Sequence, residues 1–186
     1  MAIIQGNAKQ GSVRGFYPKV INGSLRFNDD DGAYLSWTPT SAGNRKTWTL
    51  SMWVKRGNIG IEAPLWYGSP SGTYDEIRFE TNDTLNIYSY SGSYQWRLAT
   101  TQVFRDPSAW YHFVVALDTT VPEVKFYVNG EQVTAFSTNT QPSTNYEGGT
   151  NNTAGHGIGM RSDGTGNEFD GYLANVHFID GQALTA

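Results

Sequence analysis

The strict alternation of side chains between residues 47 and 55 constrains the fold more than any other feature of this sequence. Large apolar residues occupy every second position there, and mostly polar residues stand between them. A β-strand points successive side chains to opposite faces, so this segment is predicted to be a strand with one buried face. The residues predicted to be buried are Trp48, Leu50, Met52 and Val54.

Similar alternating segments follow one another along the rest of the chain, with turns between them. They occupy residues 24–37, 74–99, 110–136, 158–161 and 169–179. No segment of useful length shows the 3.6-residue period of a helix. The 21 glycines favour turns, and the 14% of aromatic residues favour strands. These patterns predict an all-β protein, an antiparallel sandwich of two sheets.

Local patterns predict several details of the chain path. Asn129-Gly130 is a strong signal for a tight hairpin turn. Residues 29–32 are predicted to turn the chain between the two strands of another hairpin. The alternation breaks near Ala174-Asn175, which predicts a β-bulge. Residues 137–156 are polar throughout and predict a long loop, which either contacts a partner or is disordered.

Size, charge and composition exclude several classes of protein. The chain has 186 residues and no cysteine, which predicts one domain (22–186) without disulfides or thiolate metal sites, preceded by an extended polar arm (1–21). The net charge is −4 and no basic run is present, which argues against nucleic acid as a partner. No apolar run reaches the roughly 18 residues that insert into a membrane, and the start lacks the pattern of a signal peptide.

Several strand segments together are characteristic of one family. Residues 110–118 (WYHFVVALD) with 124–130 (VKFYVNG), the opening segments 24–35 and 48–54, and the closing segment 169–185 carry the similarity. They resemble the laminin-G-like domains of the concanavalin A-like lectin/glucanase group. The resemblance implies a jelly roll of two curved antiparallel sheets.

The end of the closing segment points to one setting for such a domain. Residues 180–185 read Asp-Gly-Gln-Ala-Leu-Thr and are most similar to laminin-G-like domains in structural proteins of tailed phages. This resemblance implies a location in the virion, in a tail fibre or on the tail or capsid surface. It implies packing against other virion proteins, self-association for which a trimer is one arrangement, and contact with host-surface glycans. It is also compatible with a chain that continues beyond residue 186.

Residues 76–80 are the nearest match to the catalytic motif of glycanases from this superfamily. Such enzymes carry two glutamates on one strand face with an aspartate between them, and a retaining enzyme needs one of its carboxyl groups to have a raised pKa. Arg78 stands between Glu76 and Glu80, and a guanidinium lowers the pKa of neighbouring carboxylates. We therefore expect Arg78 to pair with its same-face neighbours on a solvated face. The protein is predicted not to be an enzyme, and a hydrolase with an acid–base pair elsewhere is the weaker alternative.

Aromatic residues around the turn at 91–93 are the candidates for sugar binding. If these three residues form the loop, Tyr90 pairs with Tyr94 and Tyr88 pairs with Trp96 across the hairpin. Sugars stack on aromatic rings and hydrogen-bond to amides, whereas the alternative is that the rings belong to the core. The candidates are Asn86, Tyr88, Tyr90, Tyr94 and Trp96, with Trp66 as a further one.

Two acidic loop segments are candidates for calcium, which many domains of this group hold at one rim. Calcium takes about six to eight oxygen ligands, and loops rich in Asp and Asn can supply them. The alternative is an Asp-Gly turn without a metal. The candidate ligands are Asp29, Asp30 and Asp31 in one segment and Asp163, Asn167 and Asp170 in the other.

These observations predict a non-enzymatic structural or adhesion module of a phage virion. It would act by protein–protein packing and by binding host glycans, with calcium as the one cofactor considered. The alternative is a soluble carbohydrate-binding module associated with a polysaccharide-degrading enzyme.

Overall fold

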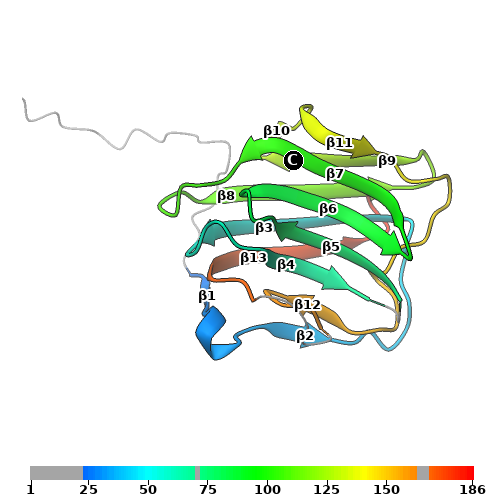
Figure 1. Cartoon of the computed structure of the whole chain (residues 1–186). Coiled ribbons are helices and arrows are strands. Elements are labelled where there is room, and N and C mark those ends of the chain that lie inside the picture. Colours follow the sequence, from blue (N-terminus) through cyan, green and yellow to red (C-terminus); the bar gives the residue numbers. More distant parts are fainter. Residues whose placement is uncertain (1–22, 70–71, 163–167) are drawn as a thin grey trace, which may run out of the picture.

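The computed structural model describes residues 23–69, 72–162 and 168–186, and arranges them in two packed antiparallel sheets (Figure 1). Within these residues, the six-stranded sheet has the order β1 (Leu25–Phe27), β13 (Gly171–Asp180), β3 (Thr47–Arg56), β8 (Tyr111–Asp118), β9 (Glu123–Val128), β10 (Glu131–Gln132). The seven-stranded sheet has the order β11 (Phe136–Thr140), β7 (Tyr94–Val103), β6 (Thr84–Ser91), β5 (Thr73–Phe79), β4 (Ala63–Gly68), β12 (His156–Ile158), β2 (Leu35–Trp37).

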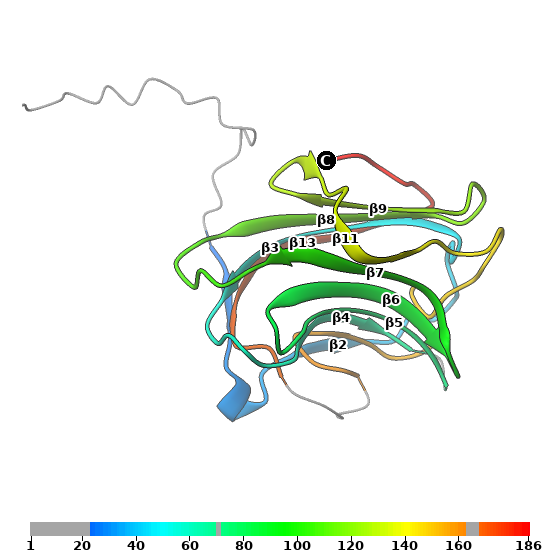
Figure 2. The same ribbon diagram turned by 45° about the horizontal axis from the view of Figure 1, so that its top comes forward.

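The two sheets form a jelly-roll sandwich, which confirms the predicted fold class. Figure 2 shows them as two curved layers, one behind the other in Figure 1. A short 3-10 helix, η1 (Asp29–Asp31), joins β1 to β2. None of the helical structure in the described residues is long and apolar enough to span a bilayer. The predicted arm at 1–21 lies outside the described residues.

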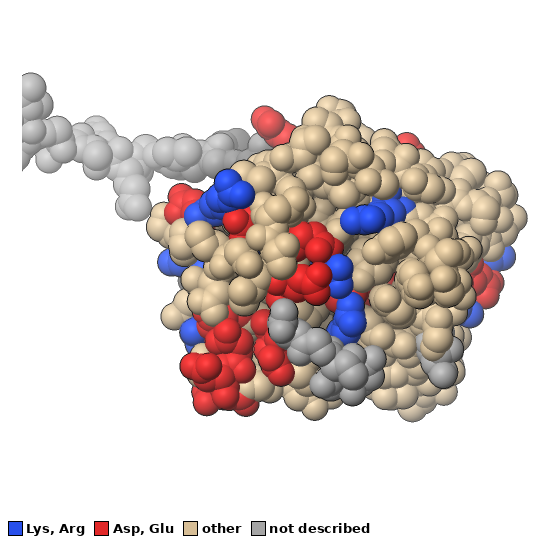
Figure 3. Space-filling view, in the orientation of Figure 1, with Lys and Arg blue, Asp and Glu red and all other residues tan. Residues whose placement is uncertain are grey.

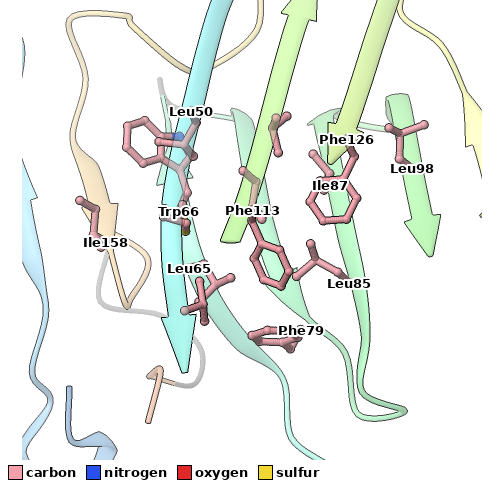
Figure 4. Close-up of a cluster of buried hydrophobic side chains, with 14 of the residues drawn as sticks. Leu50, Leu65, Trp66, Phe79, Leu85, Ile87, Leu98, Phe113, Phe126 and Ile158 are labelled. Carbon is pink, nitrogen blue, oxygen red and sulfur yellow. The ribbon is translucent and has the colours of Figure 1, made fainter. Parts of the chain in front are cut away.

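The core fills the space between the layers (Figure 4). Strand β3 lies inside the six-stranded sheet, and its predicted buried residues, Trp48 to Val54 at every second position, are all in this core. Phe113 of β8 meets Phe79 of β5 across the interface, with ring centroids 6.1 Å apart. The outward side chains of both sheets are therefore the ones available to a partner.

Two local predictions are confirmed by backbone geometry. Asn129 and Gly130 have φ angles of 52° and 87° and join β9 to β10 in a tight hairpin. Both central positions of this turn need positive φ, which Asn and Gly tolerate. The pairing of β13 with β3 shifts between Ala174 and His177, where Asn175 has a φ of 46°. This shift is the predicted bulge.

The predicted hairpin around residues 29–32 is wrong. β1 pairs with β13 in one sheet, whereas β2 pairs with β12 in the other. Residues 29–31 form η1, which carries the chain from one layer to the other, and Gly32 ends it with a φ of 59°. Alternation in sequence identifies strands but does not identify which strands pair.

The prediction that residues 137–156 form one long loop is also wrong, because both ends of this segment belong to strands. Its first residues belong to edge strand β11, and its last residue begins β12. Gly149 and Thr150 are buried against the seven-stranded sheet, where the Thr150 N–H donates to Asp75 Oδ2 at 2.7 Å. A Cβ on Gly149 would lie 2.2 Å from the carbonyl oxygen of Gly68, so only glycine allows this approach. Much of the segment therefore contacts its own domain.

Candidate functional site

The outward face of the seven-stranded sheet carries a continuous group of aromatic and charged side chains. Antiparallel pairing aligns one residue from each of five neighbouring strands, which are directly opposite one another. Side chains at such opposed positions lie on the same face and touch their neighbours. In order from β11 to β4, the row is Thr140, Arg97, Tyr88, Glu76 and Tyr67.

A bulge in β7 decides which residues reach this face. Tyr90 pairs with Tyr94 as predicted, but Ser89 pairs with Trp96, so Gln95 is an extra residue in β7. The extra residue reverses the alternation after Tyr94. The predicted pairing of Tyr88 with Trp96 is therefore wrong, because Tyr88 pairs with Arg97.

Five tyrosine rings contact one another on this outward face, which we call the tyrosine face. Tyr74 is central, with its ring centroid 5.4 Å from those of Tyr67 and Tyr90 and 6.0 Å from that of Tyr88. Tyr94 packs edge-on against Tyr88 and Tyr90 at 5.2 Å and 5.6 Å. Tyr67 and Tyr88 are buried, whereas Tyr94 is 45% exposed. Tyr94 is therefore the ring most open to a ligand.

Glu76 is the buried anion of the tyrosine face, with only 1% of its surface exposed. Arg161 donates to it twice, from Nε to Oε1 at 3.0 Å and from Nη2 to Oε2 at 2.7 Å. The Tyr88 hydroxyl donates to Oε2 of the same carboxylate. Burial and the Glu76 charge raise the pKa of Tyr88, so its phenol stays protonated and remains a donor. Both oxygens of Glu76 are therefore engaged by the protein.

Arg78 pairs with its same-face neighbours, as predicted. Its guanidinium lies 2.9 Å from Glu80 Oε1, 3.3 Å from Glu62 Oε1 and 3.9 Å from Glu76 Oε2. The prediction of a solvated face is wrong at Glu76, because the tyrosine and arginine side chains cover it. Figure 3 shows acidic and basic side chains side by side near the middle of the face presented by this sheet.

Arg97 lies beside the exposed ring of Tyr94. Its guanidinium carbon is 4.7 Å from the centre of that ring, and its Nε donates to Asn86 Oδ1 at 3.1 Å. Asn86 in turn donates to Glu80 through its side-chain amide. Since Asn86 is 1% exposed, it orients Arg97 rather than offering its own amide to a ligand.

The predicted sugar-binding residues divide between this face and the core. Tyr90 and Tyr94 lie on the tyrosine face and are accessible, whereas Tyr88 and Asn86 lie there but are covered. Trp66 and Trp96 are 2% and 1% exposed and belong to the core, so they are not available to a ligand.

The predicted calcium ligands do not converge in the part of the chain that the structure describes. Asp29 accepts a hydrogen bond from Asn58 and Asp31 accepts one from Asn28, so these carboxylates are bound to separate amides. Asp170 forms an ion pair with Arg26. No group of three or more His, Asp or Glu side chains in the described residues has the arrangement of a metal site. Asp163 and Asn167 lie outside those residues, so calcium stays a prediction.

Sequence reasoning missed three residues of the tyrosine face. Tyr74 comes from a strand whose alternation was recognised, and its outward position could have been read from that alternation. Arg97 required the bulge at Gln95, which no local pattern indicates. Arg161 follows β12 and reaches back to β5, a contact between distant segments.

Comparisons with known proteins agree with this architecture. A family model described as "Concanavalin A-like lectin/glucanases superfamily" matches residues 29–186. No curated protein sequence matches the chain significantly. Many solved structures share its fold at low sequence identity.

Three examples show which kinds of protein share this fold. A putative carbohydrate-binding protein from Bacteroides ovatus has 18% identity and a TM-score of 0.66, covering 90% of this chain and 46% of that one. Domains LG4-5 of the mouse laminin alpha1 chain have 12% identity and a TM-score of 0.62, covering 90% and 44%. Domain 4 of an extracellular arabinanase from Geobacillus stearothermophilus, in complex with arabinotriose, has 15% identity and a TM-score of 0.58, covering 76% and 64%. The chain thus spans less than two thirds of each of these structures.

Proposed function

Because the chain belongs to the Concanavalin A-like lectin/glucanases superfamily, we propose that its tyrosine face binds carbohydrate without cleaving it. The observation that carries this proposal is the exposed ring of Tyr94 next to the guanidinium of Arg97. A sugar presents C–H groups that pack on an aromatic ring and hydroxyls that accept from a guanidinium. Buried Glu76 and its partners hold the surrounding rings in place, so the binding surface is formed before the ligand arrives.

The state of Glu76 supports a function without catalysis. A glycosidase needs a carboxyl group that can transfer a proton, and a second one placed beside the scissile bond. Arg161 and Tyr88 occupy both oxygens of Glu76, and Arg78 binds Glu80. The oxygens that a glycosidase would use for proton transfer are therefore already bound to side chains of the protein itself.

The setting we propose is the virion of a tailed phage, where the domain would contact host-surface glycans and pack against other virion proteins or further copies of itself. The similarity of residues 180–185 to phage structural proteins supports this setting. Calcium binding by the aspartates at 29–31 and by Asp163, Asn167 and Asp170 remains part of the proposal.

A second setting is a carbohydrate-binding module within a polysaccharide-degrading enzyme. The shared fold with domain 4 of an arabinanase, which was solved with arabinotriose, favours this alternative. In this setting the tyrosine face would hold the enzyme on its substrate, and the chemistry would reside in another domain.

A glycan array tests the function and separates the two settings. The array carries bacterial surface glycans and plant cell-wall oligosaccharides, and is probed with wild type, Tyr94→Ala and Tyr172→Ala. Tyr172 is 38% exposed on the six-stranded sheet and serves as the matched control. We expect binding that Tyr94→Ala weakens and Tyr172→Ala leaves unchanged.

Binding confined to bacterial glycans supports the virion setting, and binding confined to plant oligosaccharides supports the enzyme setting. Absence of binding across the array would overturn the proposed function.

A further inference from the structure

The three arginines of the tyrosine face differ in their partners. Arg78 and Arg161 each form ion pairs with carboxylates on this face. Arg97 forms none with any residue of the described chain; its one hydrogen bond there goes to the neutral amide oxygen of Asn86. Arg97 is thus a cation without a compensating anion, on a surface where the other two arginines are neutralised.

The position of the Arg97 guanidinium is fixed although its charge is unpaired. The bond from Nε to Asn86 holds one edge of the guanidinium, and Tyr94 lies against it at 4.7 Å. Neither terminal nitrogen donates to an oxygen within the described residues. With Nε bound to Asn86, the two terminal nitrogens are the donors left for a ligand, and such a pair can bind a carboxylate bidentately.

The neighbours of Arg97 leave room for an anion. The residues opposite it on the adjacent strands are Thr140 on β11 and Tyr88 on β6, and both are uncharged in the folded protein. Glu76 lies one strand further away and is held by Arg161. The neighbours of Arg97 in this row therefore carry no negative charge that would repel an anionic ligand.

We propose that Arg97 binds the carboxylate of an acidic sugar, a uronic or sialic acid residue, whose ring packs beside Tyr94. The inference rests on the proposed function and adds the chemical class of the ligand. A planar carboxylate matches the fork of the guanidinium, and the adjacent aromatic ring excludes water from one side of the ion pair. A sulfated sugar carries the same charge without the planar geometry and is the competing class.

Paired glycans test this inference separately from the proposed function. Each carboxylate-bearing glycan on the array is printed beside its methyl ester, which keeps the ring and removes the charge, and sulfated glycans are added. The proteins are wild type, Arg97→Gln, Arg97→Lys and Lys125→Gln. Lys125 lies on β9 in the other sheet, and its substitution removes one positive charge away from the site.

Wild type is expected to bind acids about tenfold more tightly than their esters, the scale of a charge-assisted hydrogen bond. Arg97→Gln should lose this preference while still binding the esters, Arg97→Lys should keep part of it, and Lys125→Gln should keep all of it. Equal binding of acids and esters by wild type would overturn the acidic-sugar inference and leave the proposed function intact. Tighter binding of sulfated glycans than of carboxylated ones would overturn the inference too. Absence of all binding would instead remove the proposed function itself.

Discussion

Arg161 and Glu76 are 85 residues apart in the chain, yet Arg161 binds both oxygens of the Glu76 carboxylate on the outward face of the seven-stranded sheet. The pair connects the turn after β12 to the centre of β5. Arg161 also lies over Tyr67 and Tyr74, with its guanidinium carbon 5.7 Å from each ring centre. One residue thus neutralises the buried carboxylate and covers two rings of the tyrosine face.

Replacing Glu76 by Gln should destabilise the fold without affecting any chemistry. The substitution leaves the Arg161 guanidinium next to a neutral amide, and we expect a loss of about 2–3 kcal/mol in the free energy of unfolding. Denaturant unfolding measures it, with Glu123→Gln as control because Glu123 forms an exposed pair with Lys125. An equal effect of the two substitutions would contradict the structural role of Glu76. Hydrolysis of an array glycan by wild type, lost in Glu76→Gln, would contradict the non-enzymatic proposal.

Tyr94 and Trp96 are two residues apart in β7, but substitution of Trp96 should mainly lower stability and substitution of Tyr94 should mainly lower glycan affinity. Trp96→Ala opens a cavity between the sheets and should cost about 3–5 kcal/mol of stability. Tyr94→Ala removes an exposed ring and should cost about 1 kcal/mol, while it weakens glycan affinity about fivefold to tenfold. Denaturant unfolding and titration calorimetry measure the two effects. A stable Trp96→Ala protein would show that the position of the bulge at Gln95 is incorrect.

Asp83 should make the protein sensitive to strong acid. Burial opposes ionisation of Asp83, but hydrogen bonds from the Gly60 amide, Arg105 and Arg56 outweigh it and lower the pKa below 3.8. The stabilisation is therefore present above pH 3.8 and is lost as the pH falls through the lower folded-state pKa. Asp83→Asn keeps a side chain that tolerates its positive φ of 65° but leaves Arg56 buried without a counter-ion. We expect a loss of about 3–5 kcal/mol near neutral pH.

The control for Asp83 is an aspartate that also has a lowered pKa but is fully exposed. Asp106 accepts from Ser108, and Asp106→Asn should cost much less stability than Asp83→Asn. Unfolding curves between neutral and acidic pH test both. If Asp83→Asn is as stable as wild type near neutral pH, the buried ion pair does not contribute as described.

His156 should make the domain less stable in mild acid. The backbone N–H of Asn151 donates to Nε2 at 2.9 Å and Nδ1 donates to the Ala154 carbonyl at 2.8 Å, so the ring is neutral. Burial lowers the pKa of His156 below 6.5, and the unfolded chain therefore binds the extra proton first as the pH falls. The melting temperature should fall between about pH 7 and about pH 5, and fall less in His156→Gln. An identical pH profile for both proteins would contradict this assignment.

The strands of this protein were predictable from its sequence. The partners of the strands and the register between β6 and β7 were not. Val54 and its alternating neighbours identify β3 because burial of one face follows directly from period two. The partner of β1 could not be inferred, because η1 resembles a hairpin turn in sequence while it crosses between sheets. Because of the bulge at Gln95, Arg97 lies on the tyrosine face and Trp96 lies in the core, the reverse of the predicted arrangement. No residue type in the sequence indicates where such an extra residue is inserted. The candidate site was therefore located on the correct strands but with some of the wrong side chains.

The location of the binding surface is tested most directly by NMR titration of isotope-labelled protein with the tightest glycan from the array. The account predicts amide shift changes that centre on Tyr90, Tyr94 and Arg97 of β6 and β7 and diminish toward β13 on the other sheet. Shift changes confined to the six-stranded sheet or to the turn at 29–32, with the tyrosine face unaffected, would contradict it.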